Sequence, residues 1–354
     1  MHIPATAFRP MDDAQPSHAA GGSSTDRGTL GLPNADDATF AAAFADALEI
    51  FHGQATTAEA RFYARLRATA EPAWRLVGEV VGPFSHRTRC LTATVKFRQP
   101  LAPSSAVPSS GGDLLVEAVM PDPCFWQPEQ PFYYEVGIRL VAGDATLAEV
   151  RRQLGLRPVG AHGRRFYMQG KPWVVRAVTP GPALSDEDLL DALELGATLL
   201  VVQPPAELCE RANRHGVMVM AEVSSPSADE LVQEYRRLTR HPAVGLLLLP
   251  ADASWNDACR AATRNLLVGC RLDPTQHAGP GLAAAVPAWA QLVVLRWPHE
   301  YSPQQYAELA TQLALPVCVE RPPQRFSTLA AAKAGCDGLQ RALAGLGEFA
   351  GYFC

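Results

Sequence analysis

Residues 315–320 of this chain read LPVCVE, a run typical of a short, buried parallel strand. Four of its first five residues are apolar, and its single proline lies near the start, where a strand tolerates one. Pro322 and Pro323 follow and prevent a helix from beginning directly after it. Because barrel enzymes hold their chemistry at the carboxyl ends of their strands, Glu320 is the first candidate site residue.

The pattern of this strand recurs along the preceding chain and once after it. Continuous apolar runs alternate with amphipathic segments that carry helix caps and stops, an order typical of parallel strands covered by helices. The seven other runs are residues 173–178, 198–203, 217–222, 244–249, 266–271, 291–297 and 348–354. Eight such strands within about 180 residues predict an α/β fold, a (β/α)8 TIM barrel. A doubly wound sheet is disfavoured, because the turn after the first run, TPGPALSD, has no phosphate-binding glycine motif.

Four segments are predicted along the chain. Residues 1–36 are rich in Pro, Ser, Gly, Ala and Asp and predict a disordered leader. Residues 37–71 are rich in alanine and predict two helices, the second beginning near Thr57. Residues 72–157 contain runs with every second residue apolar and predict a small immunoglobulin-like β-sandwich, with a mobile hairpin loop at residues 100–112. Residues 158–354 form the predicted barrel.

Composition excludes several classes of partner. The chain has 354 residues, 47% of them hydrophobic, and a net charge of -5 with the two signs interspersed. We find no basic patch and predict no nucleic-acid partner, and no apolar run is long enough for a membrane span. No secretory signal is recognisable, so the prediction is a soluble, cytoplasmic protein.

The eight cysteines are scattered, with no CxxC pair, and predict free, packed thiols in a reducing compartment. The histidines lack metal-ligand spacing, so neither a metal nor a cofactor is predicted.

Three motifs around the predicted junction of the sandwich and the barrel carry a family resemblance. The chain resembles glycoside hydrolase family 2, the β-galactosidase and β-glucuronidase type, over roughly residues 75–354, whereas the N-terminal jelly roll of that family is not recognisable. Residues 240–244, Arg-His-Pro-Ala-Val, are similar to the segment that precedes the fourth strand of the family barrel. The matching junction residues are Pro123, Trp126, Pro128, Glu129, Pro131 and Tyr134, then residues 154–157, LGLR, then residues 169–172, QGKP, and Arg176.

The resemblance implies retaining hydrolysis of a β-glycoside by two carboxyl groups. By position, Glu320 falls on the nucleophile and Asp252 on the general acid/base. Two departures stand out: Ala251 replaces the asparagine before the acid/base, and Val201 replaces an arginine on the second strand. Aspartate is also one methylene shorter than the glutamate of the family, which shifts the acid group.

Other predicted strand ends supply further candidates. We assign Arg176, Glu222, Trp297 and Tyr301 to substrate binding at the mouth of the barrel. Each candidate has a structural alternative. Glu320 is alternatively a solvated carboxylate paired with Arg321 or Arg176, and Glu222 a partner of Arg176 or of a helix terminus. Asp252 is alternatively the N-cap of a helix near Trp255 or Asn256, and the aromatic residues are alternatively plugs of the barrel mouth.

The sequence therefore predicts a protein similar to glycoside hydrolases, with carbohydrate as its partner and a reduced catalytic site. The alternative is an inactive barrel that binds a glycan or another protein, because three expected polar groups are altered. A third alternative is a structural subunit, in a homo-oligomer or a larger assembly, that docks through residues 37–71.

Overall fold

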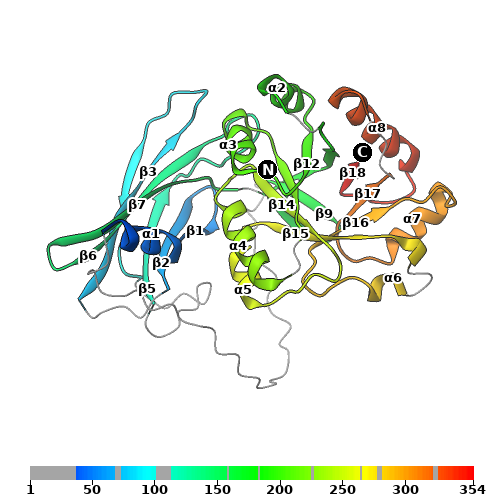
Figure 1. Cartoon of the computed structure of the whole chain (residues 1–354). Helices are drawn as coiled ribbons and strands as arrows, with labels where there is room; N and C mark the ends of the chain where they lie inside the picture. Colours follow the sequence, from blue (N-terminus) through cyan, green and yellow to red (C-terminus); the bar gives the residue numbers. More distant parts are fainter. Residues whose placement is uncertain are drawn as a thin grey trace, which may run out of the picture. The chain divides into compact units, whose positions relative to one another are not determined.

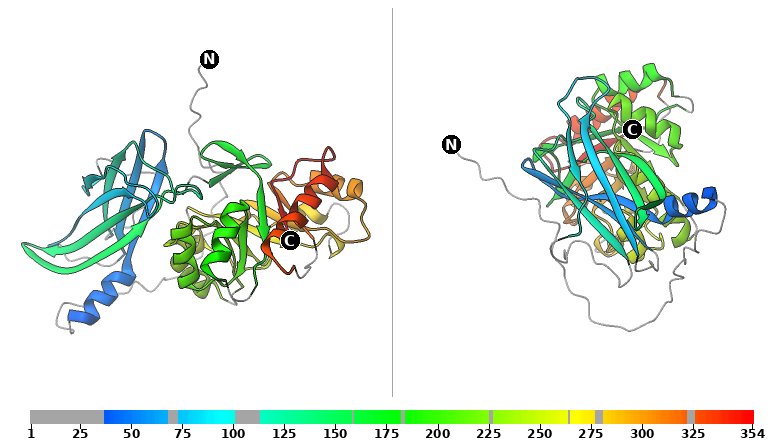
Figure 2. Two further views of the ribbon diagram at one scale, coloured as in Figure 1. Left: turned by 90° about the horizontal axis from the view of Figure 1, so that it is seen from above. Right: turned by 90° about the vertical axis from the view of Figure 1, so that its left-hand side faces the viewer.

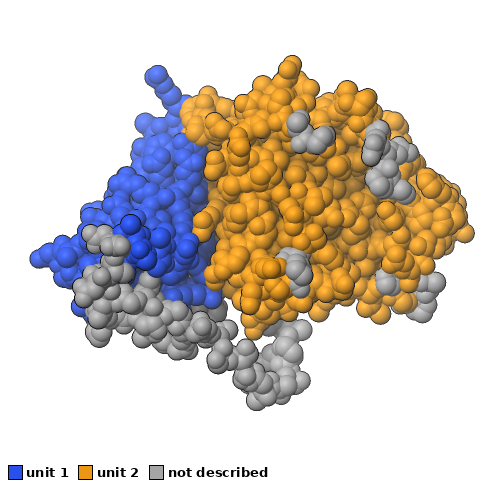
Figure 3. All heavy atoms as spheres, viewed as in Figure 1, with its two compact units in different colours: residues 1–84, 89–124, 133–154 blue, residues 85–88, 125–132, 155–354 orange. Residues whose placement is uncertain are grey.

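The computed structural model describes residues 37–67, 73–100, 113–157, 159–181, 184–224, 227–263, 265–276, 281–321 and 326–354. The predicted leader, residues 1–36, and residues 101–112 of the predicted hairpin loop lie outside this part of the chain. The chain divides into two compact units (Figure 3). The first comprises residues 1–84, 89–124 and 133–154, and the second residues 85–88, 125–132 and 155–354.

Two separate antiparallel sheets form the first unit. One sheet has the order β1-β2-β5 and the other β4-β3-β6-β7. The ring of Phe62 in β2 contacts that of Tyr134 in β6 with centroids 5.2 Å apart, so the two sheets pack through their apolar faces. The elements are α1 (Asp37–Ala47), β1 (Leu48–Ala55), β2 (Glu59–Leu66), β3 (Trp74–Phe84), β4 (Ala93–Lys96), β5 (Leu114–Pro121), β6 (Tyr133–Ala142) and β7 (Ala145–Leu154).

A buried tyrosine fixes the entry to β6. The Tyr134 hydroxyl accepts a hydrogen bond from the Cys124 N–H at 2.7 Å and donates to the Cys124 carbonyl at 3.3 Å. A tyrosine at the start of a strand that bonds back to the preceding connection is a feature of immunoglobulin-like sandwiches. The immunoglobulin-like assignment nevertheless stays a prediction.

The prediction of a second helix before the sandwich is wrong. Among the described residues 37–67, only α1 is helical, and residues 48–55 and 59–66 are paired strands of the first sheet. Strand β2 lies between β1 and β5 and is buried on both faces, with Phe62 packed on one side and Tyr63 stacked on Phe51. Tertiary pairing overrides the helix propensity of this alanine-rich run. The alternation of β2, with Ala60, Phe62, Ala64 and Leu66 on one face, is the strand signal that the helix prediction passed over.

The second unit contains a closed barrel of eight parallel strands, as predicted (Figure 1). Each strand pairs in parallel with the next, and the last closes the ring by pairing with the first. Most strand residues are Val, Leu or Ala, and nearly all of these are buried, so the barrel is built from apolar side chains. The strands are β11 (Val175–Val178), β12 (Thr198–Val202), β13 (Val219–Glu222), β14 (Val244–Leu249), β15 (Leu267–Leu272), β16 (Leu292–Arg296), β17 (Val317–Glu320) and β18 (Gly351–Phe353).

Helices lie outside the ring of strands, and local signals mark where several begin (Figure 2). Side chains cap the first turn of five of the described helices, namely Ser185, Ser227, Asn256, Ser302 and Thr328. The helical elements are α2 (Asp186–Glu194), α3 (Ala206–His215), α4 (Ala228–Thr239), α5 (Asp257–Ala262), η1 (Pro274–Gln276), α6 (Gly281–Ala284), α7 (Pro303–Thr311) and α8 (Leu329–Leu343). No helix in the described ranges is long and apolar enough to cross a membrane.

A small antiparallel sheet precedes the barrel in the chain. It has the order β10-β9-β8 and consists of β8 (Val159–His162), β9 (Arg165–Met168) and β10 (Lys171–Trp173). Val159 lies close to Gly245, near the start of β14, so this sheet adjoins the amino end of the barrel. The carboxyl ends of the strands, where the candidate residues lie, form the opposite end.

Candidate functional site

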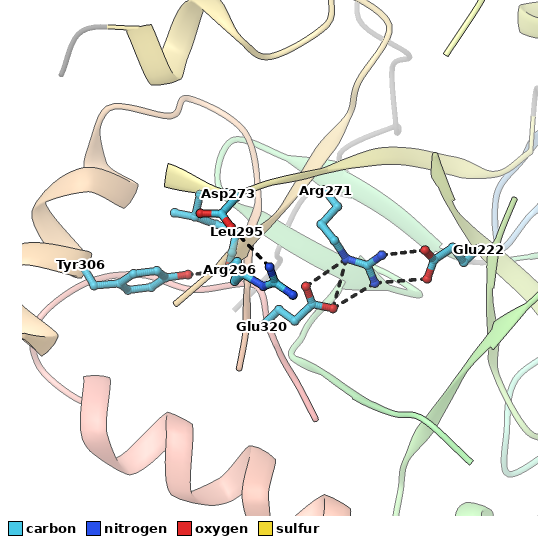
Figure 4. Close-up of polar contacts among 7 residues, drawn as sticks. All are labelled: Glu222, Arg271, Asp273, Leu295, Arg296, Tyr306 and Glu320. Atoms are coloured by element: carbon cyan, nitrogen blue, oxygen red, sulfur yellow. Dashed lines mark hydrogen bonds and ion pairs between the residues drawn. The ribbon is translucent and has the colours of Figure 1, made fainter. Parts of the chain in front are cut away.

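Three charged side chains from alternate barrel strands meet at the carboxyl end of the barrel (Figure 4). Glu222 ends β13, Arg271 lies near the end of β15, and Glu320 ends β17. Alternate strands of a (β/α)8 barrel contribute to the same layer of side chains inside it. The three residues therefore form one charged layer, which we call the Glu-Arg-Glu bridge.

The guanidinium of Arg271 lies between the two carboxylates and donates to both. Its Nη1 and Nη2 lie 2.6 and 3.1 Å from the two carboxylate oxygens of Glu222. Its Nε and Nη2 lie 3.1 and 2.9 Å from Oε1 of Glu320, and Nε also lies 2.9 Å from Oε2. Two-pronged contacts of this kind fix orientation as well as charge.

Glu320 is the most buried of the three side chains, and the central Arg271 is the most exposed. The exposed fractions of the side chains are 32% for Arg271, 24% for Glu222 and 12% for Glu320. Burial raises the pKa of Glu320, and the charge and hydrogen bonds of Arg271 offset only part of this increase. For Arg271 burial lowers the pKa, but the contacts with Glu222 and Glu320 outweigh it, so that its pKa is raised. Arg271 is therefore charged.

A second ion pair lies beside this bridge. Arg296, at the end of β16, is paired in register with Glu320, so the two side chains point to the same side of the sheet. Its Nη1 lies 3.3 Å from Oδ2 of Asp273. Burial acts to raise the pKa of Asp273, but hydrogen bonds from Thr275 and the charge of Arg296 lower it overall. The mouth of the barrel is therefore lined with paired charges.

Trp297 points away from this mouth. It follows Arg296 and lies on the opposite side of the strand, where its ring stacks on Tyr306 of α7 with centroids 5.2 Å apart. The guanidinium of Arg321 lies 5.8 Å from the Trp297 ring, which is 9% exposed. Tyr301 lies in the following turn, and its carbonyl accepts a hydrogen bond from Trp297 Nε1 at 2.9 Å. The Trp297 ring therefore packs between strand and helix.

The structure places Arg176 and Asp252 away from the bridge contacts. Arg176 donates to Asp337 at 2.9 Å and Gln340 at 2.7 Å, both on α8, so it is the partner of neither Glu222 nor Glu320. Asp252 lies exposed in the turn after β14. It does not cap α5, because the side chain of Asn256 does so by accepting from Cys259 N–H. The capping alternative for Asp252 is wrong, since the helix begins later than that alternative requires.

Sequence analysis overlooked Arg271 and Arg296. Each is a charged residue at the end of an apolar run, the same signal that singled out Glu320. Applied evenly to every predicted strand, that signal would have found both. Their pairing with Glu320, Glu222 and Asp273 depends on strand order and register, which no local pattern contains.

A cavity of 480 Å³ lies to one side of the bridge. It opens between the carboxyl ends of β11 and β12 and helix α3, and its walls include Leu200, Val202, Glu207 and Arg211. None of the predicted site residues lines it. In the described part of the chain, no group of three His, Cys, Asp or Glu side chains is arranged to hold a metal ion.

The chain matches no protein-family model and no curated protein. Among solved structures, a putative β-galactosidase from Bacteroides fragilis is similar, with a TM-score of 0.56 and 16% identity over 87% of this chain and 54% of that one. The likeness is one of fold. A β-glucuronidase from Bacteroides uniformis has a TM-score of 0.57 and 14% identity, over 87% of this chain and 45% of the enzyme. A β-D-glucuronidase from Dictyoglomus thermophilum has a TM-score of 0.55 and 13% identity, over 86% and 61%. The chain thus spans about half the length of these enzymes.

Proposed function

We propose that this protein is a glycoside hydrolase-like barrel that binds carbohydrate without hydrolysing it. The observation that carries this proposal is the position of Arg271, whose guanidinium lies between Glu222 and Glu320 and donates to both. The candidate nucleophile is thereby a member of an internal ion bridge.

Retaining hydrolysis requires room for a sugar between two carboxyl groups. These groups lie ~5 Å apart, so that one attacks the anomeric carbon while the other protonates the leaving oxygen. In this chain the guanidinium is the group that faces the Glu320 carboxylate, and the candidate acid Asp252 lies on an exposed turn. A pyranose that reached Glu320 would have to displace Arg271 and leave two carboxylates without their shared cation.

Carbohydrate is the proposed ligand because of the fold and the polar character of the mouth. The similar structures are named as a β-galactosidase and β-glucuronidases. Arg296, Asp273 and Thr275 supply hydrogen-bond donors and acceptors of the kind that sugar hydroxyls require. We place the ligand above the Glu-Arg-Glu bridge and leave Arg176 out of the proposed site, because its side chain is directed at α8.

Slow hydrolysis is the second candidate function. The position of Arg271 favours slow hydrolysis in one respect. Arg271 places a cation beside Glu320, where the family resemblance expects the strand-two arginine that Val201 replaces. In this case Glu320 is the nucleophile and Asp252 a weakened acid/base, as the sequence predicts.

Dinitrophenyl β-glycosides distinguish the two candidates. These leaving groups depart with little acid assistance, so a misplaced Asp252 does not hide a working nucleophile. We expect no turnover by the wild type or by Glu320→Gln. Turnover that is present in the wild type and lost in Glu320→Gln would refute the non-hydrolysing proposal.

Calorimetric titration with a panel of oligosaccharides tests the binding itself. We expect Arg296→Gln to weaken binding of any ligand found, and Arg151→Gln, an exposed arginine of β7 in the other unit, to leave it unchanged. If no glycan binds the wild type, the carbohydrate proposal fails and a protein partner becomes the hypothesis to test. Sedimentation over a range of concentrations then tests the predicted homo-oligomer.

A further inference from the structure

Two cysteines meet where the barrel closes. Cys336 lies on α8, and Cys354 follows β18, the strand that completes the ring. Both residues donate to one acceptor, the carbonyl of Ala177 in β11: the Cys354 N–H at 3.0 Å and the Cys336 Sγ at 3.5 Å. The shared acceptor brings the two residues together.

The surroundings of the pair leave room for the Cys354 thiol. A Cβ atom at Gly335, the residue before Cys336, would lie 3.0 Å from Cys354 Sγ and 3.0 Å from the Phe326 ring. Glycine at this position therefore admits the thiol between helix and strand. Cys354 is partly exposed, whereas Cys336 is fully buried, so a small reagent reaches the pair through Cys354.

The two thiols differ in acidity. The neighbouring Cys336 thiol lowers the pKa of Cys354, a change that burial opposes and the charge of Arg321 assists. The neighbouring Cys354, together with burial, raises the pKa of Cys336. Because the thiolate is the reactive form, Cys354 is the thiol suited to attack a disulfide reagent first. Cys336 is then the thiol that attacks the resulting mixed disulfide.

We propose that Cys336 and Cys354 form a reversible redox pair, oxidised to a disulfide by small-molecule disulfides such as oxidised glutathione. The Cys354 thiolate attacks one sulfur of the glutathione disulfide, forms a mixed disulfide and releases one glutathione thiolate. The Cys336 sulfur then attacks Cys354 Sγ, its proton passes to a glutathione thiolate, and the second glutathione leaves. Two protein thiols are oxidised to one disulfide, and one glutathione disulfide is reduced to two thiols.

The new bond would tie α8 to the strand that closes the barrel. It would close a loop over residues 336–354, and it would lie next to the mouth, since the Cys354 carbonyl accepts from the Thr179 N–H at 2.9 Å. Thr179 also lines the 480 Å³ cavity. The proposed disulfide therefore stiffens the first and last strands at the carboxyl end of the barrel, independently of whether that end binds a sugar.

The test is to equilibrate the full-length protein in glutathione buffers of increasing oxidised fraction. Free thiols are then alkylated, and the protein is digested without reduction and examined by mass spectrometry. We expect one cross-linked peptide that contains Cys336 and Cys354, lighter by two hydrogen atoms than its separate parts. We also expect a rise of roughly 5 °C in the melting temperature, because the bond closes a loop in the unfolded chain. Both changes should reverse with dithiothreitol.

Variants keep the result interpretable. Cys354→Ser should abolish the cross-linked peptide, and Gly335→Ala should slow its formation by displacing the thiol without removing it. The matched control is Cys124→Ser, which changes a partly buried cysteine of the other unit and should leave the cross-link unchanged. Cys336 and Cys354 that both remain alkylatable after unfolding in the most oxidising buffer would overturn the proposal. Cross-links of either residue to another cysteine, or stable glutathione adducts, would overturn it as well.

Discussion

A largely buried arginine lies at each end of the barrel, and the two guanidinium groups donate hydrogen bonds to different kinds of acceptor. At the amino end, the buried guanidinium of Arg157 donates to three neutral carbonyls, those of Thr239, His241 and Pro242. At the carboxyl end, Arg271 donates to the two carboxylates of Glu222 and Glu320. The first arrangement joins backbone segments, and the second balances charge. The amino end is thus held by hydrogen bonds to neutral groups, whereas charges at the carboxyl end are balanced against one another.

Some of the residues that carry the family resemblance, namely Trp126, Gly155 and Arg157, lie together at the amino end. The side chain of Trp126 is 1% exposed, and the backbone N–H of this residue donates to the Leu156 carbonyl. A Cβ atom at Gly155 would lie 2.4 Å from the Pro242 Cβ, so only glycine fits there without movement. Arg157 completes this cluster at the end of α4, where carbonyl groups and the helix dipole favour a cation. The resemblance therefore predicts the fold well and says little about chemistry at the other end.

The largest effect is expected from Arg157→Met. The variant leaves three carbonyls without their buried donor and should lower the free energy of unfolding by about 4 kcal/mol. Urea denaturation followed by tryptophan fluorescence measures it. The control from the opposite end is Arg296→Met, whose side chain is 40% exposed and paired with Asp273, and which should cost less than about 1 kcal/mol. Equal losses for the two variants would contradict the contrast between the two ends.

A pH dependence of the amino end follows from His241. Burial, assisted by the charges of Arg237 and Arg157, lowers its pKa to about 4, against 6.5 for an ordinary histidine. Between these values the unfolded chain binds more protons, so stability is complete above pH 6.5 and falls as the pH falls toward about 4. We expect wild type to lose on the order of 3 kcal/mol over this window through His241.

The measurement is a series of urea transitions from pH 7 to pH 4 for wild type and His241→Gln. The variant should lack this part of the acid sensitivity, so its stability should vary less with pH. His299→Gln, which alters a histidine in the exposed turn after β16, is the control and should follow the wild type. Parallel curves for wild type and His241→Gln would argue against a buried neutral histidine.

Arg271→Met tests the carboxyl end. It leaves Glu222 and Glu320 without their shared cation, and because Arg271 is one third exposed, we expect a loss of about 2 kcal/mol rather than the full cost of a buried charge. The triple variant Glu222→Gln, Arg271→Met, Glu320→Gln should regain most of that stability, because no uncompensated charge remains. Thermal denaturation of the two variants beside the wild type is the measurement. A triple variant less stable than Arg271→Met would show that the bridge stabilises the fold by its own contacts.

The barrel was predictable because its signals are local and repeated. Each apolar run, such as residues 244–249, is long enough for a buried strand, and the polar caps between the runs, such as Ser185 and Ser302, mark helix starts. The strand β2 was not predicted, because its alanine-rich surroundings favour a helix. Its pairing with the neighbouring β1 and with β5, which is distant in sequence, makes it a strand.

The sequence predicted which strand ends carry charged residues, but it did not predict which of these side chains contact one another. A charged residue at the end of an apolar run marks the mouth of the barrel, and Glu222 and Glu320 were selected by this rule. The direction of a side chain at a strand end depends on register, and a shift of one residue exchanges inside and outside. Arg296 and Trp297 are neighbours that point to opposite sides, and the sequence analysis named only Trp297 of this pair.

The smallest expected effect concerns the charge of Glu320 itself. Its pKa is raised from 4.5, so in the window above this value the folded protein binds more protons than the unfolded chain. Stability is therefore lost as the pH rises from 4.5 through the folded pKa of Glu320, the opposite sign to His241. Glu320→Gln stays neutral at every pH, and the stability of this variant relative to wild type should increase through the window. The measurement is urea denaturation from pH 4 to pH 8, with the exposed Glu308→Gln of α7 as control. A relative stability that decreases with pH would mean that attraction to Arg271 outweighs the burial of Glu320, and the carboxyl end would then be held by its charges as firmly as the amino end is by its carbonyls.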